Sequence, residues 1–277
     1  MSHNLLKGKK GIIFGALNDR SIAWKVAEKA YGEGAEFVLT NAPPAMRLGE
    51  INHLAEKCNA PIVPADATSL DDLKEVFDVA MKKYGKLDFV LHSIGMSQNV
   101  RKHIPYESVN YNYYLKTLDV SALSFHKVLH LAYELDALNE WASVLALSYV
   151  ASHRTLFEYS DMADAKAALE SIARNFGYVY GRDKKVRVNT ISQSPTYTTA
   201  GMGIKGFDAM VDFSDRMSPL GNASAEECAD FCIMMFSDFS RKVTMQNLFH
   251  DGGFSSMGMS ERAIRQYQKS FEQTDQE

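Results

Sequence analysis

The chain has 277 residues, of which 46% are hydrophobic and 23% charged, as is usual for a globular protein. Its formal net charge of −4 gives no sign of a clustered basic surface, so we expect no nucleic-acid partner. No segment approaches the roughly 18 consecutive apolar residues of a membrane span, and residues 1–10 lack the apolar core of a signal peptide. We therefore expect a cytoplasmic protein with no membrane partner.

Short apolar runs alternate with segments of helical periodicity along the chain. The runs typical of buried parallel strands are residues 11–14, 37–40, 61–65, 87–91, 143–147, 186–191 and 246–250. Between them, the periodicity predicts helices over residues 21–31, 46–57 and 69–83, one ending near 135 and one reaching 180. Pro43 and Pro44 predict the exit turn of the second strand. The polar tail after Ser260 is compatible with a further helix.

This alternation continues without a linker, a composition break or an internal repeat. It predicts an α/β fold with one Rossmann-type doubly wound parallel sheet of about seven strands and helices on both faces. We expect a single domain over residues 1–277, with an insertion that shows no strand pattern at about 194–221.

The three cysteines, Cys58, Cys228 and Cys232, match no zinc spacing with the eight histidines. Cys228 and Cys232 lie four residues apart in an expected helix, which favours buried thiols over a disulfide. A small, odd number of cysteines is typical of a reducing compartment. We therefore expect no metal site.

In an open parallel sheet, ligands bind beyond the carboxyl ends of the strands. After the first strand the chain reads Gly15-x5-Ser21-Ile22, which differs from the Gly-x-Gly-x-x-Gly fingerprint. Gly15 would let backbone approach closely, and the free amides at Ile22 would face a phosphate. A plain strand-to-helix turn capped by Ser21 is an equal alternative.

The next strand exits carry weaker candidates. The acid that usually holds the ribose of NAD is absent, because Asn41 and Ala42 follow the second strand. Arg47 is a candidate for a 2′-phosphate contact, although such an arginine is more often solvated. Asp66 would accept a hydrogen bond from adenine or act as a turn residue. His92-Ser93-Ile94-Gly95 would bring small residues and backbone against a cofactor.

Tyr149, Tyr159 and Lys166 are the candidates for chemistry. Lys166 follows Tyr159 by seven residues, close to two helical turns, so we expect both side chains to face the same way. An ammonium near a phenol favours the phenolate and strengthens the phenol as a proton donor. That pair suits a reaction in which negative charge grows on a substrate oxygen. A surface lysine beside two core tyrosines is the alternative.

Together, these motifs resemble the short-chain dehydrogenase/reductases, and specifically the enoyl-acyl-carrier-protein reductases, across nearly the whole chain. The resemblance rests on the order and spacing of Gly15-x5-Ser21-Ile22-Ala23, Asp66-Ala67, His92-Ser93-Ile94-Gly95, Leu147-Ser148-Tyr149, Tyr159-x6-Lys166, Arg187-Val188-Asn189-Thr190-Ile191-Ser192 and Asp251-Gly252-Gly253-Phe254. Ordinary members of the superfamily use Tyr-x3-Lys, with a serine about thirteen residues before the tyrosine. Here those two places hold Met162 and Tyr149, which argues against a carbonyl reductase.

The resemblance implies reduction of the C2–C3 double bond of trans-2-enoyl thioesters on acyl carrier protein, in the last step of the fatty acid elongation cycle. It implies NADH as cofactor, with NADPH left open, and a homotetramer. It implies catalytic roles for Tyr159, Lys166 and Tyr149, and a substrate helix at about residues 198–210. The cofactor-binding residues that it implies are Gly15, Ser21, Ile22, Asp66, Ala67, Ser93, Ile94, Gly95, Lys166, Pro195 and Thr198, and the substrate-binding residues are Met96, Tyr149, Tyr159 and Met162.

The chain departs from the family pattern around the substrate pocket. Ser194-Pro195 replaces the usual Gly-Pro, Tyr197 replaces an arginine, and Glu158 replaces a proline or a small residue. Two alternatives stay open: a 3-oxoacyl or other carbonyl reductase of the same superfamily, and a non-catalytic cofactor-binding protein with the same fold. The first would need Tyr-x3-Lys. The joint presence of Gly95, Tyr159, Lys166 and Thr198 argues against the second.

Overall fold

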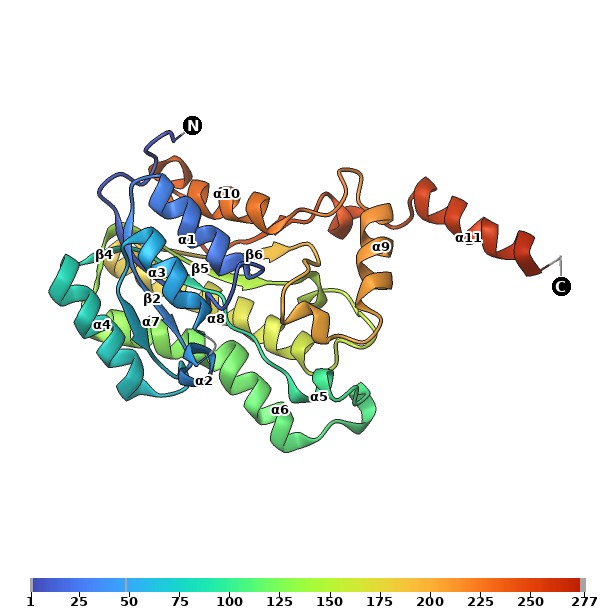
Figure 1. Cartoon of the computed structure of the whole chain (residues 1–277), viewed down its shortest axis with the longest axis horizontal. Coiled ribbons are helices and arrows are strands. Elements are labelled where there is room, and N and C mark those ends of the chain that lie inside the picture. Colours follow the sequence, from blue (N-terminus) through green and yellow to red (C-terminus); the bar gives the residue numbers. More distant parts are fainter. Residues whose placement is uncertain (1, 48, 275–277) are drawn as a thin grey trace.

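A computed structural model of the chain describes residues 2–47 and 49–274. At its centre is a seven-stranded sheet in the order β3-β2-β1-β4-β5-β6-β7, with every neighbouring pair parallel (Figure 1). The strands are β1 (Lys10–Phe14), β2 (Glu36–Asn41), β3 (Ile62–Pro64), β4 (Leu87–His92), β5 (Leu138–Ser148), β6 (Arg187–Gln193) and β7 (Asn247–His250). The predicted α/β fold is confirmed, and all seven carboxyl ends meet at one edge.

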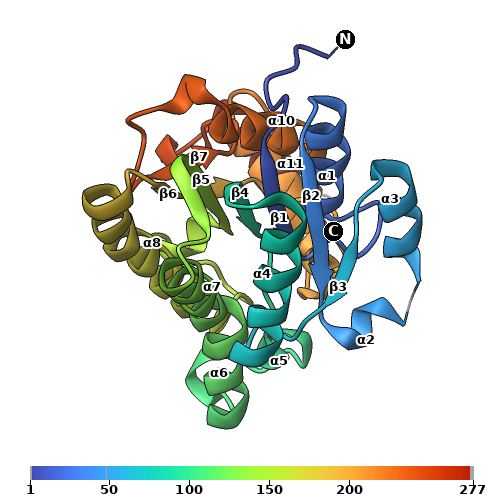
Figure 2. The same ribbon diagram turned by 90° about the vertical axis from the view of Figure 1, so that its left-hand side faces the viewer.

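Helices cover both faces of the sheet (Figure 2). One face carries α4 (Leu70–Tyr84), α7 (Ser124–Glu134) and α8 (Met162–Lys184), and the other carries α1 (Ile22–Gly32), α3 (Glu50–Cys58) and α10 (Ala225–Phe236). Successive side chains of a strand point to opposite faces. In β1, Ile12 and Phe14 therefore join the first core, whereas Ile13 joins the second.

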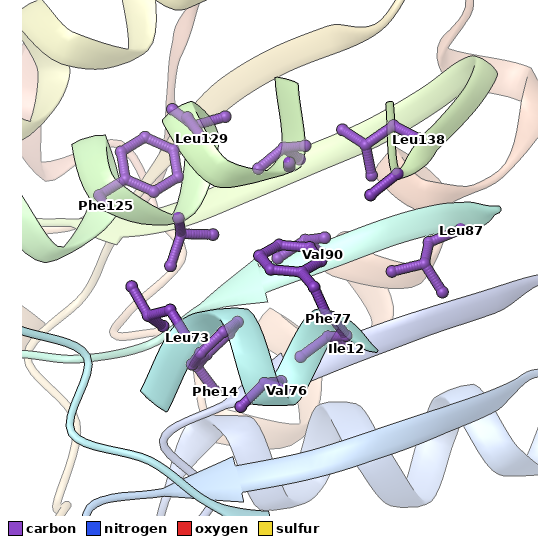
Figure 3. Packing of buried hydrophobic residues seen from close by; sticks show 14 of the residues in the cluster. Ile12, Phe14, Leu73, Val76, Phe77, Leu87, Val90, Phe125, Leu129 and Leu138 are labelled. Atoms are coloured by element: carbon purple, nitrogen blue, oxygen red, sulfur yellow. The ribbon is translucent and has the colours of Figure 1, made fainter. Parts of the chain in front are cut away.

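The packing of the first core explains why the strands are apolar runs. Ile12 and Phe14 of β1 and Val90 of β4 pack against Leu73 and Phe77 of α4 (Figure 3). Since the opposite face of the same strands is covered as well, a polar residue has no exposed side to occupy. The continuous apolar runs that predicted the strands follow from this double burial.

Shorter elements surround the sheet. They are α2 (Pro43–Met46), α5 (Gln98–Arg101), α6 (Tyr111–Leu118), a π-helical turn (Asp119–Leu123), α9 (Phe207–Met217) and α11 (Glu261–Thr274), with 3-10 turns at Tyr106–Ser108, Val150–Ser152, Gly201–Gly203, Asp238–Ser240 and Phe254–Ser256. The helix expected after Ser260 is present as α11, which stands away from the rest of the molecule in Figure 1.

Three expectations are wrong in the type or the boundaries of the element. The helix predicted over residues 46–57 is split into α2 and α3, and Gly49 between them has a left-handed φ of 74°. Pro43 and Pro44 start α2 rather than forming an exit turn, because proline fits the first helical turn, where its missing N–H is not needed. In the insertion, the helix expected at 198–210 begins only at Phe207, after Gly206 at a φ of 69°.

None of the helices in the described ranges is long and apolar enough to cross a membrane. The cysteines Cys58, Cys228 and Cys232 are all buried free thiols. The expectation of thiols rather than a disulfide at positions 228 and 232 is therefore confirmed.

Candidate active site

Gly15 joins the exits of two neighbouring strands. Its φ is +95°, and a Cβ built on it would lie only 2.0 Å from the carbonyl oxygen of Ser93, which follows β4. The Gly15 amide donates to the carbonyl of Thr40 in β2 at 3.0 Å. Only glycine therefore allows the backbone after β1 to approach the backbone after β4. The result is a floor of bare backbone at the sheet edge.

The N-terminus of α1 lies next to this floor and has no side-chain cap. Ser21 precedes the helix, but its hydroxyl donates to the Asn18 carbonyl at 2.7 Å and accepts from the Leu17 amide at 3.2 Å. The first turn of α1 carries no acidic residue. Its first amides, beginning with Ile22, are thus free to face an anion, which the helix dipole also favours. Ser21 thus occupies the N-cap position without capping the helix through its side chain.

The exits of β2 and β3 hold polar residues in local contacts. The Asn41 amide donates to the Ala16 carbonyl at 3.0 Å and so ties the end of β2 to the loop after β1. Asp66 is exposed, and one of its carboxylate oxygens accepts from both the amide and the hydroxyl of Thr68. The Asp66 carboxylate therefore holds a local turn at this exit. The neighbouring Ala67 is buried in the first core.

The exit of β4 brings backbone to the lysine of α8. A Cβ on Gly95 would lie 3.8 Å from Lys166 Nζ and 3.8 Å from Met162 Cε. The Met96 backbone is held by the Ser121 hydroxyl at 3.0 and 3.2 Å. The structure therefore places Gly95 beside two of the residues expected at the cofactor and the substrate.

His92, at the end of β4, belongs to the core. Its Nε2 lies 2.8 Å from the Ser124 hydroxyl, and burial, aided by Lys166, lowers the pKa of its imidazole to about 3. The ring is neutral at physiological pH and is stacked among buried groups, so His92 supports the site without titrating in it.

Tyr159 lies in a turn before α8 and not on the helix. The helix starts at Met162, and the residues on either side of the tyrosine, Glu158 and Ser160, have left-handed φ values of 62° and 44°. Since consecutive α-helical residues need negative φ, the helix cannot extend back to Tyr159. The expected arrangement of Tyr159 and Lys166 on one helical face is wrong, although both side chains are buried near the same point.

Asp161 connects this turn to the loop after β4, a contact that the sequence pattern does not predict. The carboxylate is fully buried and accepts from the Ser97 hydroxyl at 2.6 Å and the Asn99 amide at 2.8 Å. Ser97 and Asn99 are themselves buried. An aspartate just before a helix predicts an ordinary cap, so its long-range partners are visible only in three dimensions.

The aromatic and cationic candidates come together at the edge of the sheet. The rings of Tyr149 and Tyr159 lie 5.2 Å apart between centroids, and Tyr159 packs with Met162 and Ala165 in a small buried cluster. Lys166 is only 8% exposed, and its ammonium donates to the Leu147 carbonyl at 2.7 Å. The alternative of a surface lysine is therefore wrong.

Burial decides the charge states in this cluster. It lowers the pKa of Lys166 to about 8, against an opposing contribution from Glu170. Burial also raises the pKa of Tyr159 well above its ordinary value of 10.0, with a further contribution from Tyr149. The expected shift of Tyr159 towards phenolate is therefore absent. At neutral pH the phenol keeps its proton and can donate it.

A separate cleft of about 650 Å³ opens where the insertion faces the loop after β1. Pro195 and Thr196 line one side, and Asp19 and Arg20 line the other. The Asn18 amide also donates to the Thr199 hydroxyl at 3.0 Å, so the two segments are in contact. Thr198 turns inward on its own loop, where its hydroxyl accepts from the Gly201 amide at 3.0 Å. Tyr149, Tyr159 and Lys166 do not line this cleft, whereas Tyr197 does.

Comparison with known proteins agrees with this geometry. Residues 15–255 match the family model described as enoyl-(acyl carrier protein) reductase. The chain is 34% identical over 260 residues to enoyl-acyl-carrier-protein reductase (NADH) 2 of Rhizobium meliloti, covering 93% of this chain and 95% of the relative.

Solved structures of related proteins have the same architecture. The FabI–NADH complex of Alistipes finegoldii is 62% identical, covers 96% of this chain and 94% of its own, and has a TM-score of 0.94. The enoyl-acyl carrier protein reductase of Bacillus cereus, solved with NADP+ and an indole naphthyridinone, is 28% identical with a TM-score of 0.86, covering 94% of this chain and 100% of its own. The chain therefore belongs to the enoyl-acyl-carrier-protein reductase family of the short-chain dehydrogenase/reductase superfamily.

Proposed function

We propose that this protein reduces the C2–C3 double bond of trans-2-enoyl thioesters carried on acyl carrier protein, with NADH as the hydride donor. The observation that carries the proposal is the buried, protonated phenol of Tyr159 beside Tyr149, with the ammonium of Lys166 close by, at the carboxyl edge of the sheet. Enoyl reduction needs such a proton donor, because hydride addition places negative charge on the thioester oxygen.

The residues present fit a dinucleotide. The bare backbone at Gly15 and the uncapped first turn of α1, at Ser21 and Ile22, suit a pyrophosphate. Further along the edge, Ser93, Ile94 and Gly95 offer backbone and small side chains to the nicotinamide half. The remaining residues that we assign to the cofactor are Asp66, Ala67, Lys166, Pro195 and Thr198. Bound there, NADH supplies the hydride that C3 of the substrate accepts.

We assign a different role to each side chain of the Tyr149–Tyr159–Lys166 cluster and to the two methionines beside it. Tyr159 donates a hydrogen bond to the thioester oxygen as charge grows on it, and a donor aimed at such an oxyanion contributes about 3–4 kcal/mol. A proton taken up at C2 then collapses the enolate to the saturated thioester and completes the reduction. Lys166, held against the Leu147 carbonyl, positions the nicotinamide ribose and keeps positive charge near the reacting carbonyl. Tyr149 forms a wall of the pocket against Tyr159. Met96 and Met162 supply flexible apolar contacts for the acyl chain.

We assign NADH rather than NADPH because no arginine stands directly at the exit of β2. Asn41 there is bonded to the Ala16 carbonyl, and Arg47 is an exposed residue beyond α2. We also propose a homotetramer in the cytoplasm, as the family resemblance implies, and sedimentation equilibrium tests the assembly.

The function is tested by following NADH absorbance with a crotonyl thioester of acyl carrier protein. We expect oxidation of NADH that depends on the thioester, and slower turnover with NADPH at equal concentration. Turnover of a 3-oxoacyl thioester alone would instead identify a carbonyl reductase. Binding of NADH without turnover of either thioester would identify a non-catalytic cofactor-binding protein.

A further inference from the structure

Glu170 is a buried carboxylate to which the mechanism above gives no role. It lies one helical turn after Lys166 on α8 and is only 2% exposed. No lysine or arginine in the described part of the chain forms an ion pair with it. A buried carboxylate without such a cation is costly unless hydrogen bonds compensate for the lost water, so its partners indicate what it is for.

Three donors hold the Glu170 carboxylate. One oxygen accepts from the hydroxyls of Ser148 and Ser152, both at 2.5 Å. The other oxygen lies 2.7 Å from Nε2 of His153, whose side chain is half exposed. Ser148 is the last residue of β5, whereas Ser152 and His153 belong to the turn that follows Tyr149. One carboxylate therefore connects α8 to the strand exit and to the segment after it.

The same strand exit holds Lys166. The Leu147 carbonyl accepts from the Lys166 ammonium, and the hydroxyl of the next residue, Ser148, donates to Glu170. Adjacent residues of β5 thus hold a cation and an anion that lie one turn apart on α8. An anion at this separation stabilises the ammonium form of a buried lysine.

We propose that Glu170 is a positioning residue for Lys166: its carboxylate, fixed by Ser148, Ser152 and His153, keeps the buried lysine charged and seated against Leu147. Burial alone acts in the opposite direction, since it lowers the pKa of Lys166, and Glu170 is the group that opposes it. The inference rests on the proposed role of Lys166 at the cofactor.

Other titratable groups around α8 already have partners or are neutral. His92 of β4 is neutral at physiological pH, and burial keeps the phenols of Tyr149 and Tyr159 protonated. Among the acids and bases on α8 and the elements packed against it, Asp161 is bonded to Ser97 and Asn99, Asp164 to Tyr114, and Asp119 is paired with Lys127. The ring of His126 packs on Phe176, Arg187 is bonded to carbonyls at the end of α10, and Glu140 at the exposed start of β5 is paired with Lys185. Glu170 is thus the carboxylate left to act on Lys166.

The test compares NADH affinity from pH 6 to pH 10 for wild type and Glu170→Gln, measured by fluorescence titration. In wild type the affinity should fall as pH rises through about 8, where Lys166 loses its proton. Without the carboxylate this decline should move down by about one pH unit. At pH 8 the variant should then bind NADH about fivefold more weakly, because the binding-competent fraction falls from one half to about a tenth. At pH 6 it should match wild type within twofold.

Recovery at pH 6 separates a change in charge from structural damage, which would weaken binding at every pH. Glu140→Gln makes the same chemical change at an exposed site of β5 and should follow wild type throughout. In a Lys166→Arg background, where the cation cannot lose its proton, Glu170→Gln should leave the pH profile unchanged. A decline that stays at the wild-type pH in Glu170→Gln, or that still moves in the arginine background, would overturn the inference.

If Glu170→Gln does not fold, the half-exposed His153 offers a milder pair of variants. His153→Arg places a permanent cation beside Glu170 and should move the decline to lower pH, whereas His153→Gln supplies an uncharged donor and should not. Coincident profiles for these two variants would overturn the inference. The readout is NADH binding, so a wild-type protein that binds NADH but reduces no enoyl thioester would count against the proposed function and leave this test intact.

Discussion

Backbone strain and burial together fix the conformation and the protonation state of the Tyr159 side chain. Its two neighbours adopt left-handed backbone, which costs an ordinary residue about 1–2 kcal/mol each. The buried carboxylate of Asp161 holds the turn in this conformation from one side. Strain of this kind persists where the surroundings over-determine it, and it concentrates at functional sites.

Tyr159→Phe should lower kcat by about 10²–10³-fold, because it removes the donor to the thioester oxygen. The dissociation constant for NADH should stay within twofold of wild type, since the ring and its packing remain. Steady-state kinetics and fluorescence titration measure the two quantities. Tyr133→Phe, a matched change on α7 away from the site, serves as the control. Unchanged turnover in Tyr159→Phe would contradict the assigned role.

The buried imidazole of His92 should make the free energy of unfolding depend on pH in the acid range. In the unfolded chain an ordinary histidine titrates near pH 6.5, whereas burial holds the folded pKa at about 3. Between these values only the unfolded state binds the proton, so stability is intact above pH 6.5 and falls as pH decreases towards 3. At pH 5 the loss from this residue should be about 2 kcal/mol.

Urea unfolding at pH 5 and pH 7.5 measures the effect. Burial also lowers the pKa of His126 and His250, so only the difference between wild type and His92→Gln isolates His92. The glutamine variant should lose about 2 kcal/mol less between the two pH values. Equal losses in both proteins would show that His92 titrates normally in the fold.

At the scale of the elements, the sequence predicted the strands better than the segments between them. Apolar runs mark all seven strands, and most clearly the central ones, whose side chains are buried on both faces. The start of β5 was missed: Asn139 and Glu140 are polar, and Trp141 has a φ of 67° next to a register shift against β4. Polar residues and an irregular register interrupt the continuous apolar run that marks a buried strand. The sequence pattern therefore predicts this strand only over residues 143–147.

The residues of the site are likewise only partly predictable from the sequence. Motif spacing predicted Tyr149, Tyr159 and Lys166 as the candidates for chemistry; in the structure the two tyrosine rings lie 5.2 Å apart, and the Lys166 ammonium donates to the Leu147 carbonyl. Motif spacing does not identify Asp161 or Glu170. From the sequence alone, an acid in or next to a helical segment is expected to be solvated, because its partners from distant segments are not known. Helical spacing also misplaced Tyr159, since left-handed φ values at Glu158 and Ser160 leave no mark on hydrophobic periodicity.

Gly15→Ala tests the junction of β1 and β4. The new Cβ would meet the Ser93 carbonyl at 2.0 Å in a left-handed conformation, so one of the two strand exits has to move. We expect a loss of more than about 2 kcal/mol in the free energy of unfolding, together with weaker NADH binding. Gly8→Ala is the matched control, because Gly8 has a φ of +79° but nothing within 4 Å of the built Cβ. A loss no larger than that of the control would contradict a steric requirement at Gly15.

For the whole molecule, cofactor binding and folding are linked. A ligand that binds only the folded state raises the free energy of unfolding by about 2.7 kcal/mol at a free concentration 100 times its dissociation constant. NADH should therefore raise the melting temperature by several degrees, as measured by differential scanning fluorimetry. NADPH at the same concentration should raise it less. Equal shifts would contradict the assignment of NADH, and the absence of a shift with either would contradict the cofactor site.

The strand order has a consequence for how the chain is made. β1 is synthesised first and lies inside the sheet; β2 and then β3 extend one side, and β4 to β7 extend the other in order of synthesis. Each new strand therefore pairs with a strand that has already left the ribosome. No gap has to remain in the sheet for a strand that is synthesised later. The sheet can grow outward during translation, and the carboxyl edge, with the groups to which we assign the chemistry, is complete only when the last strand docks.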